Sequence, residues 1–134
     1  MVCLAGVRPS QSLTKQQIAL REGISGNYIA QILVTLKNAG LVSSHRGSQG
    51  GFTLARAPAA ISVADMVEAV DGPICIVPCV AQPKTCDRVA ECVTRTVWRR
   101  TDEAIRGLLA SISLRDLAEQ VRETVNNGAI AFEI

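Results

Sequence analysis

The sequence predicts a mainly α-helical fold: a winged helix-turn-helix with a small β-hairpin wing, followed by a long C-terminal helix. Three features predict this class. Two helical stretches are separated by a tight turn at Gly23, and a glycine-rich hairpin, LVSSHRGSQGGFTLAR, follows directly at 41–56. A longer helix then runs from about Val93 to about Ala110. A hairpin placed directly after a helix-turn-helix is typical of a wing.

The helix-turn-helix is predicted from caps and apolar spacing. Residues 1–7 resemble the last turns of an apolar helix, so we expect the natural fold to start further upstream. Ser12 is predicted to cap a helix through about Glu22, and Gly23 stands where a left-handed residue is needed. The second helix is predicted to start at Ser25 and to end at Gly40, because apolar residues recur at i, i+3, i+4 and i+7: Ile29, Ile32, Leu33 and Leu36.

The wing is predicted from two short strand-like runs, Leu41–Ser43 and Phe52–Leu54, around RGSQGG. Glycine permits close approach of the backbone, so Arg46 and the amides near Gly47 and Gly50 could approach phosphates or a minor groove. The alternative is an ordinary solvated hairpin. His45 is interpreted as a surface or phosphate-contacting residue rather than a metal ligand.

The remaining elements follow the same signals. Two S-x-x-D capping boxes, Ser62 with Asp65 and Ser113 with Asp116, predict helix starts. The first of these helices should end at 71–73, DGP, and the segment 74–92 is predicted to be a loop. The predicted units are a winged helix-turn-helix at 1–73, a cysteine loop at 74–92, a long helix with a following helix at 93–125, and a tail at 126–134.

Composition limits the class of protein. The 134 residues are 48% hydrophobic, which suffices for a core, and no apolar run is long enough to span a membrane. The opening has no secretory leader, so we expect a cytoplasmic protein. Residues 1–56 carry six Lys/Arg against Glu22 alone, whereas residues 57–134 carry eight basic and eleven acidic residues. The N-terminal half is therefore the part suited to a polyanion.

Three of the five cysteines stand in CVAQPKTCDRVAEC, at 79, 86 and 92. Thiols stay reduced in the cytoplasm and an odd number cannot pair completely, so a disulfide staple is disfavoured. The spacing C-x6-C-x5-C leaves three alternatives: a soft-metal centre such as an iron–sulfur cluster or zinc, a thiol switch, or structurally idle cysteines. Cys75 is a possible extra thiol or a packed apolar residue, and Cys3 is expected in the core.

An enzyme is not expected. Nothing in the sequence connects the single histidine, His45, to the cysteine loop, and no other base or substrate pocket is indicated.

ISGNYIAQILVTLKNAGLVSSHRGSQGGFTLAR, ISVADMVEAVDGP, the cysteine loop and TRTVWRRTDEAIRGLLASISLRDL together resemble the Rrf-two-type winged-helix regulators, over about Ser12 to Ala118. The resemblance implies a homodimer, with the long helix and Trp98 at its interface. It implies that Cys79, Cys86 and Cys92 hold an iron–sulfur cluster, of [2Fe–2S] or [4Fe–4S] type. It also implies binding to double-stranded DNA at a pseudo-palindrome. The expected DNA-contacting residues are Ser25, Asn27, Tyr28, Gln31, Lys37, Arg46, Gly47, Gln49 and Gly50.

Three positions depart from the pattern. IscR-like members have a histidine three residues after the last cysteine, where this chain has Arg95; NsrR-like members can use a ligand near the N-terminus; and some members read DNA with an acidic residue where this chain has Ala30. The predicted function is a transcriptional regulator that senses redox state, nitric oxide or iron–sulfur status through a cluster. The alternative is a winged-helix regulator with a thiol switch or zinc.

Overall fold

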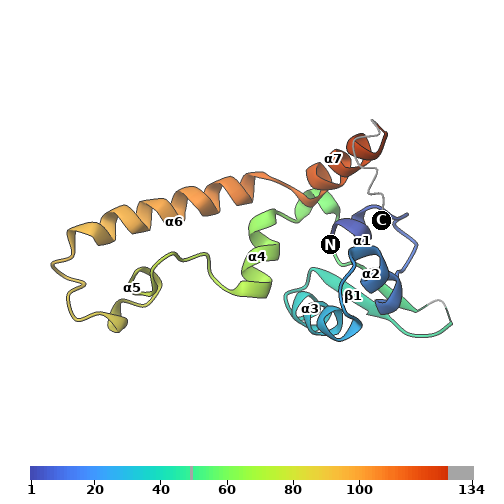
Figure 1. Ribbon diagram of the computed structural model, residues 1–134, viewed down its shortest axis with the longest axis horizontal. Helices are drawn as coiled ribbons and strands as arrows, with labels where there is room; N and C mark the ends of the chain where they lie inside the picture. The colour runs from blue at the N-terminus through green and yellow to red at the C-terminus, as the bar shows by residue number, and fades with distance from the viewer. Residues whose placement is uncertain (49, 127–134) are drawn as a thin grey trace.

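The computed structural model describes residues 1–48 and 50–126 and divides into a head and an arm (Figure 1). The head contains α1 (Val2–Ala5), α2 (Lys15–Glu22), α3 (Gly26–Asn38), β1 (Val42–His45), β2 (Gly51–Leu54), the 3-10 helix η1 (Pro58–Ala60), α4 (Val63–Asp71) and α7 (Leu114–Asn126). The arm contains α5 (Pro78–Ala81), the 3-10 helix η2 (Pro83–Thr85) and α6 (Val93–Ser111). Among the described residues, no helix combines the length and apolar character needed to cross a bilayer.

The core of the head joins segments that are far apart in the sequence. Leu13, Leu41, Ile61 and Leu114 are at most 1% exposed, and they come from four different segments. Burying one Leu or Ile side chain completely stabilises the folded state by about 1.5–3 kcal/mol. The apolar side of α3 completes this core with Ile29, Leu33 and Leu36. The predicted period of that helix and its Ser25 cap are therefore confirmed.

The predicted start of α2 was wrong. Thr14, not Ser12, caps the helix: its Oγ1 accepts a hydrogen bond from the Gln17 amide at 3.2 Å, and Gln17 Oε1 accepts one from the Thr14 amide at 2.9 Å. This is the T-x-x-Q form of the capping box. Leu13 is extended because it pairs with Phe52, exchanging two backbone hydrogen bonds of 3.0 and 2.8 Å. The segment before α2 thus forms an isolated bridge to the wing strand β2. The left-handed Gly23 at the end of α2, with φ of 63°, confirms that part of the prediction.

The wing is a two-stranded antiparallel hairpin in which Val42 pairs with Leu54 and His45 with Gly51. β1 begins one residue later than predicted and extends two residues nearer the turn, to His45, and β2 begins one residue nearer the turn, at Gly51. His45 Nε2 and Thr53 Oγ1 lie 2.9 Å apart across the hairpin, which holds the base of the turn.

A backbone joint connects the head to the arm. The Val63 amide donates to the Ile112 carbonyl at 2.9 Å, and the Leu114 amide donates to the Ile61 carbonyl at 2.8 Å. Ser62, which precedes α4, and Ser113, at which the chain returns from the arm, therefore lie side by side. Both predicted capping boxes are formed here: the Ser62 amide donates to Asp65 at 2.9 Å and the Ser113 amide to Asp116 at 2.8 Å.

The two capping carboxylates predict a specific loss of stability in acid. The hydrogen bonds from the Ser62 and Ser113 amides lower the pKa of Asp65 and of Asp116 below the ordinary 3.8. Because the unfolded chain binds these protons more tightly, the stabilisation is complete above that value and disappears as pH falls through the lowered folded pKa. The double variant D65N/D116N should therefore lose less thermal stability than wild type between about pH 6 and pH 3. Calorimetry at several pH values across this range measures the loss of thermal stability in both proteins.

Asp87→Asn, on the exposed cysteine-bearing segment, is the matched control and should lose stability in acid as wild type does. If the double variant also matched wild type, the capping boxes would not be the source of the acid sensitivity.

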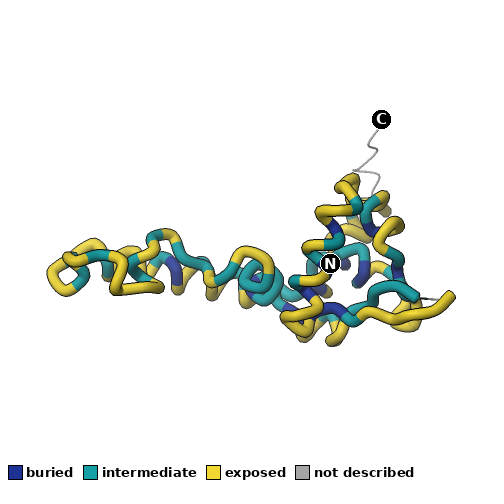
Figure 2. The backbone as a smooth tube through the Cα atoms, turned by 90° about the horizontal axis from the view of Figure 1, so that it is seen from below, coloured by how far each residue is buried: buried dark blue, intermediate teal, exposed yellow. Residues whose placement is uncertain are grey.

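The arm is built on α6, whose 19 residues span about 28 Å. Its large apolar side chains are unusually exposed: Val93 is 84% exposed, Val97 60% and Leu108 62%. Glu68 on α4 accepts a 2.7 Å hydrogen bond from Arg106 and so connects α6 to the head. Figure 2 shows most of the arm as exposed, with one buried segment on α6. The predicted bounds of this long helix are confirmed to within a residue.

Candidate functional site

The exposed side of α3 forms the first part of the candidate site. Ser25 caps the helix by accepting a hydrogen bond from the Tyr28 amide at 3.3 Å. The buried side faces the core, which turns the opposite side to solvent. Five of the predicted DNA-contacting residues are exposed on this helix or at its cap: Ser25, Asn27, Tyr28, Gln31 and Lys37. Together they form a polar surface with a half-exposed aromatic ring.

The wing tip is the second part. Arg46 is exposed next to the turn, and the Gly50 amide donates to the Gly47 carbonyl at 2.9 Å. A Cβ on Gly50 would lie 2.7 Å from the His45 carbonyl oxygen, so only glycine permits this tight turn. The structure therefore places an arginine and close-packed backbone at the tip. The predicted contact at Gln49 lies outside the described residues.

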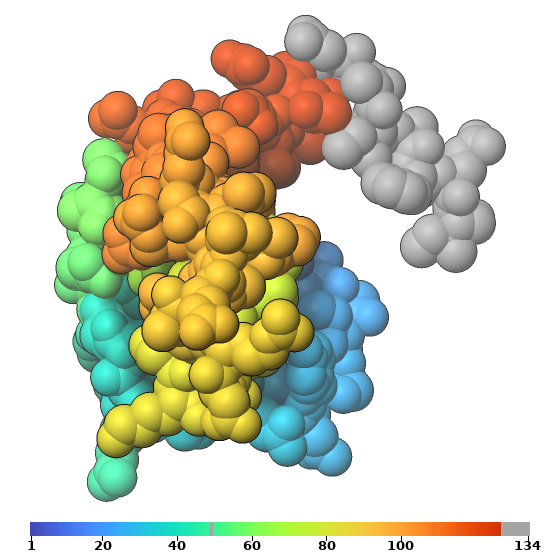
Figure 3. Space-filling view, turned by 90° about the vertical axis from the view of Figure 1, so that its left-hand side faces the viewer, coloured from blue at the N-terminus to red at the C-terminus, as the bar shows by residue number. Residues whose placement is uncertain are grey.

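The cysteine loop is the third part and belongs to the arm. Pro78 and Pro83 each start a short helical turn, so the segment predicted as a loop is partly ordered into α5 and η2. Figure 3 shows this segment, in yellow, and the start of α6, in orange, at the end of the arm. Among the described residues all five cysteines are free and half-buried thiols.

Cys92 occupies the cap position of α6. Its Sγ lies 3.2 Å from Thr94 Oγ1, and this hydrogen bond, together with that of the Arg95 amide, lowers the pKa of the Cys92 thiol. The amides at a helix start favour a thiolate. The thiolate form of Cys92, which is the form that binds metals and reacts as a nucleophile, is therefore favoured.

The other loop cysteines are held differently. Arg95 Nε donates to the Cys79 carbonyl oxygen at 3.3 Å, and the Cys75 thiol donates to the Val77 carbonyl at 2.9 Å. The donor set of three thiols suits a soft metal or an iron–sulfur cluster. Within the residues described, however, no three His, Cys, Asp or Glu side chains are grouped closely enough to hold a metal ion. The residues therefore fit a cluster in chemistry, and binding one requires the loop to close.

One residue of this site was missed by the sequence reasoning. Asp102 on α6 is only 8% exposed, and its Oδ1 accepts a 2.9 Å hydrogen bond from the Ile76 amide at the start of the loop. A signal was present: Asp102 follows Trp98 by four residues and precedes Ile105 by three, so it is a carboxylate on the apolar side of a predicted helix. Asp102 lies about 15 Å along α6 from Cys92, and its partner Ile76 follows Cys75 in the sequence.

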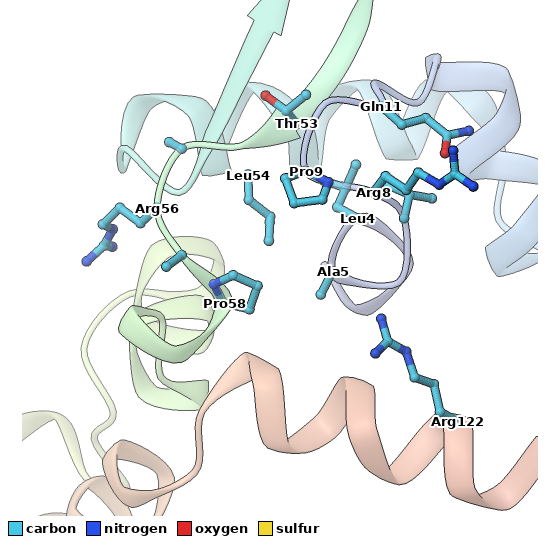
Figure 4. A pocket seen from close by; sticks show the side chains of 13 residues that line it. Leu4, Ala5, Arg8, Pro9, Gln11, Thr53, Leu54, Arg56, Pro58 and Arg122 are labelled. Atoms are coloured by element: carbon cyan, nitrogen blue, oxygen red, sulfur yellow. The ribbon is translucent and has the colours of Figure 1, made fainter.

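A cavity of about 490 Å³ lies elsewhere, between α1, the end of β2, η1 and α7. Its wall is largely apolar, with three arginines at its edge: Arg8, Arg56 and Arg122. Arg122 extends from α7 toward Ala5, whereas Arg56 turns away from the cavity (Figure 4). None of the predicted site residues lines it, so it is separate from both the DNA-facing surface and the thiols.

The profile of the Rrf2 family, described as an iron-dependent transcriptional regulator, matches residues 1–120. Protein rrf2 of Nitratidesulfovibrio vulgaris is 35% identical over 107 residues, which are 80% of this chain and 71% of that protein. Among solved structures, CymR, titled the global cysteine regulator of B. subtilis, superposes with a TM-score of 0.71 at 31% identity, covering 89% of this chain and 87% of CymR. IscR of T. potens superposes with a TM-score of 0.72 at 32% identity, covering 92% of this chain and 80% of IscR.

Proposed function

The chain belongs to the Rrf2 family of transcriptional regulators, and from this membership we propose that it senses a chemical signal through Cys79, Cys86 and Cys92. It is a DNA-binding winged-helix regulator and not an enzyme. The observation that carries the proposal is the attachment of the cysteine loop to α6, through Arg95 and Asp102. Since α6 returns to the head at the joint, a change in the loop has a physical route to the DNA-binding surface.

The proposed DNA contacts follow the geometry of the head. The exposed side of α3 enters the major groove, so Asn27, Tyr28 and Gln31 approach base edges, and Ser25 and Lys37 approach phosphates. Arg46, Gly47, Gln49 and Gly50 at the wing approach the backbone or the minor groove. The basic excess of residues 1–56 supports this assignment, because phosphate contacts contribute much of the affinity.

We assign the arm to homodimerisation. Val93, Val97, Trp98 and Leu108 expose apolar surface along α6, which would be covered by the same helix of a second copy. A two-fold dimer presents two heads to one duplex, so the operator is expected to be a pseudo-palindrome. Sedimentation of the wild-type protein and of Trp98→Glu tests the assignment: the wild type should be a dimer and the variant should dissociate.

The cluster is the favoured form of the sensor. Cys92 supplies a thiol of lowered pKa, and Cys79 and Cys86 supply the other two ligands after the loop closes. A bound iron–sulfur cluster supplies a centre whose charge and integrity respond to oxidants and to nitric oxide. The iron dependence in the family's description supports this choice.

A thiol switch is the second candidate, and one observation favours it. In the described chain the three thiols are not close enough to one another to hold a metal ion. In this form, oxidation of Cys92 and a neighbouring thiol to a disulfide would change the loop, with an external oxidant such as peroxide reduced to water.

Measurement of iron, acid-labile sulfide and zinc on protein purified without oxygen separates these forms. Iron and sulfide in near-equal amounts, with visible charge-transfer absorption, support the cluster. Protein without metal that forms a reproducible Cys–Cys linkage with peroxide supports the switch, and stoichiometric zinc alone contradicts both. If DNA affinity were the same in every redox and metal state, the sensing proposal would be wrong.

Arg46→Ala should weaken binding to specific and random DNA alike, by about tenfold. The reason is the loss of one phosphate contact, which should also reduce the slope of log K against log salt by about 1. Titration of labelled duplexes at several salt concentrations measures both quantities. Arg99→Ala, exposed on α6 and paired with Glu103 at 2.9 Å, removes the same charge from the arm and should bind as wild type does. Wild-type affinity in Arg46→Ala would contradict the wing assignment.

A further inference from the structure

Asp102 is the one charged side chain that is buried in the described part of the chain. Its Oδ1 accepts a 2.9 Å hydrogen bond from the Ile76 amide, 26 positions earlier in the sequence, whereas its buried Oδ2 has no hydrogen-bond partner. Burying a carboxylate is costly unless it is paired and hydrogen-bonded, and here only one of its two oxygens has a partner. We propose that Asp102 is a positioning residue that anchors the start of the cysteine loop on α6 and transmits the chemical state of the loop to the arm.

A second contact shows how the loop lies on α6. Arg95 Nε donates to the Cys79 carbonyl oxygen at 3.3 Å. Ile76 precedes Cys79, while Asp102 follows Arg95, so this stretch runs antiparallel to α6. Only Val77 and Pro78 separate the two attached points on the loop, Ile76 and Cys79, which leaves little slack between them. A movement of Cys79 that breaks its contact with Arg95 therefore pulls directly on the contact between Ile76 and Asp102.

Asp102 is not suited to be a metal ligand itself. It lies ten residues along α6 from Cys92, which corresponds to about 15 Å in an α-helix. Ligands of one small centre cannot be so far apart. The carboxylate therefore acts through the position of the loop, which it holds at Ile76, the residue after Cys75.

The unpartnered Oδ2 makes the anchor releasable. With the Ile76 amide bound to Oδ1, the neighbouring Oδ2 is buried and has no hydrogen-bond partner. Release of the loop lets water reach both carboxylate oxygens, and this gain offsets part of the lost hydrogen bond. The covered and released arrangements are thereby brought closer in free energy, which a two-state device requires.

The transmission part of this inference rests on the proposed sensing function, and the test separates the two. The full chain is purified without oxygen, and exchange of the Ile76 amide is followed by hydrogen–deuterium mass spectrometry. The dissociation constant for a duplex that the wild type selects from a random pool is measured before and after hydrogen peroxide. The ratio of these two constants is the response.

Asp102→Ala should raise exchange at Ile76 by at least about tenfold and bring the response close to one. Asp102→Asn keeps an oxygen acceptor and should remain within about threefold of wild type in both measurements. Glu103→Ala is the matched control, because Glu103 is exposed on the same helix and pairs with Arg99. It should behave as wild type does.

If exchange at the Ile76 amide is unchanged in Asp102→Ala, Asp102 does not anchor the loop. If exchange increases but DNA binding still responds to peroxide as in wild type, Asp102 does not transmit the state of the loop. If Asp102→Ala fails to fold, Ile76→Pro removes the donor from the loop side: loss of the response supports the proposal, and a wild-type response overturns it. If the wild type itself does not respond to peroxide, transmission of peroxide oxidation is overturned, and exchange at Ile76 still decides whether Asp102 anchors the loop.

Discussion

Gly51→Ala is expected to destabilise the head by about 2–4 kcal/mol, a large part of the stability of a small domain. A Cβ at this position would lie 2.7 Å from the Leu13 carbonyl oxygen and 2.8 Å from its carbonyl carbon. Both are backbone atoms, so no side chain can rotate to make space. The strand must instead move away from Leu13, which breaks the two hydrogen bonds between Leu13 and Phe52. Urea denaturation followed by circular dichroism measures the loss.

The same variant should bind DNA weakly at physiological temperature, because the bridge between Leu13 and Phe52 fixes the wing relative to α2 and α3. Gly26→Ala is the matched control, since an added Cβ at Gly26 meets no atom within 4 Å. Its stability should equal or exceed that of wild type, because alanine favours the helix. An unfolding midpoint of Gly51→Ala equal to that of wild type would show that the bridge does not hold the wing.

Serine at Cys79, Cys86 or Cys92 is expected to reduce bound iron by about tenfold and to abolish the response of DNA binding to peroxide. A serine hydroxyl remains protonated and is a poor ligand for iron, so two thiolates would remain where three are needed. Iron and acid-labile sulfide per protomer, measured on protein purified without oxygen, provide the readout. The DNA titration described for Arg46→Ala measures the second effect.

Cys75→Ser and Cys3→Ser are the matched controls and should keep their iron. Cys75 precedes Ile76, which is attached to Asp102 about 15 Å along α6 from Cys92, and Cys3 packs against the core of the head. Equal loss of iron in Cys75→Ser would add Cys75 to the ligand set. Full iron content in all three loop variants would mean that iron binds elsewhere.

Much of the fold could be predicted because its signals are local. The boxes at Ser62 and Ser113 and the left-handed Gly23 each depend on residues within one turn, and each is formed. The wrong start of α2 overlooked a local signal. Thr14 is followed three residues later by Gln17, which completes a capping box, whereas Ser12 is followed by Lys15, which cannot. The pairing of Leu13 with Phe52, 39 positions away, adds a non-local contribution that the sequence pattern does not contain.

The candidate site also has a part that could be predicted from the sequence and a part that could not. The polar side of α3 follows directly from its apolar period, so the exposure of Asn27 and Gln31 was predictable. The arrangement of the cysteine loop was not, because it has no period and is positioned by contacts with α6. Asp102 shows the limit: its place on the apolar side of a helix was visible, but its partner, the Ile76 amide, is a backbone group that sequence patterns do not distinguish.

The joint at Ser62 and Ser113 has an evolutionary consequence. Because the chain departs and returns through adjacent, hydrogen-bonded backbone, the intervening segment begins and ends at one place on the head. Insertions and deletions between the end of α4 and the start of α6 can therefore accumulate without changing the register of the DNA-binding elements. The segment between Asp71 and Val93 can in this way be exchanged while the head keeps its architecture.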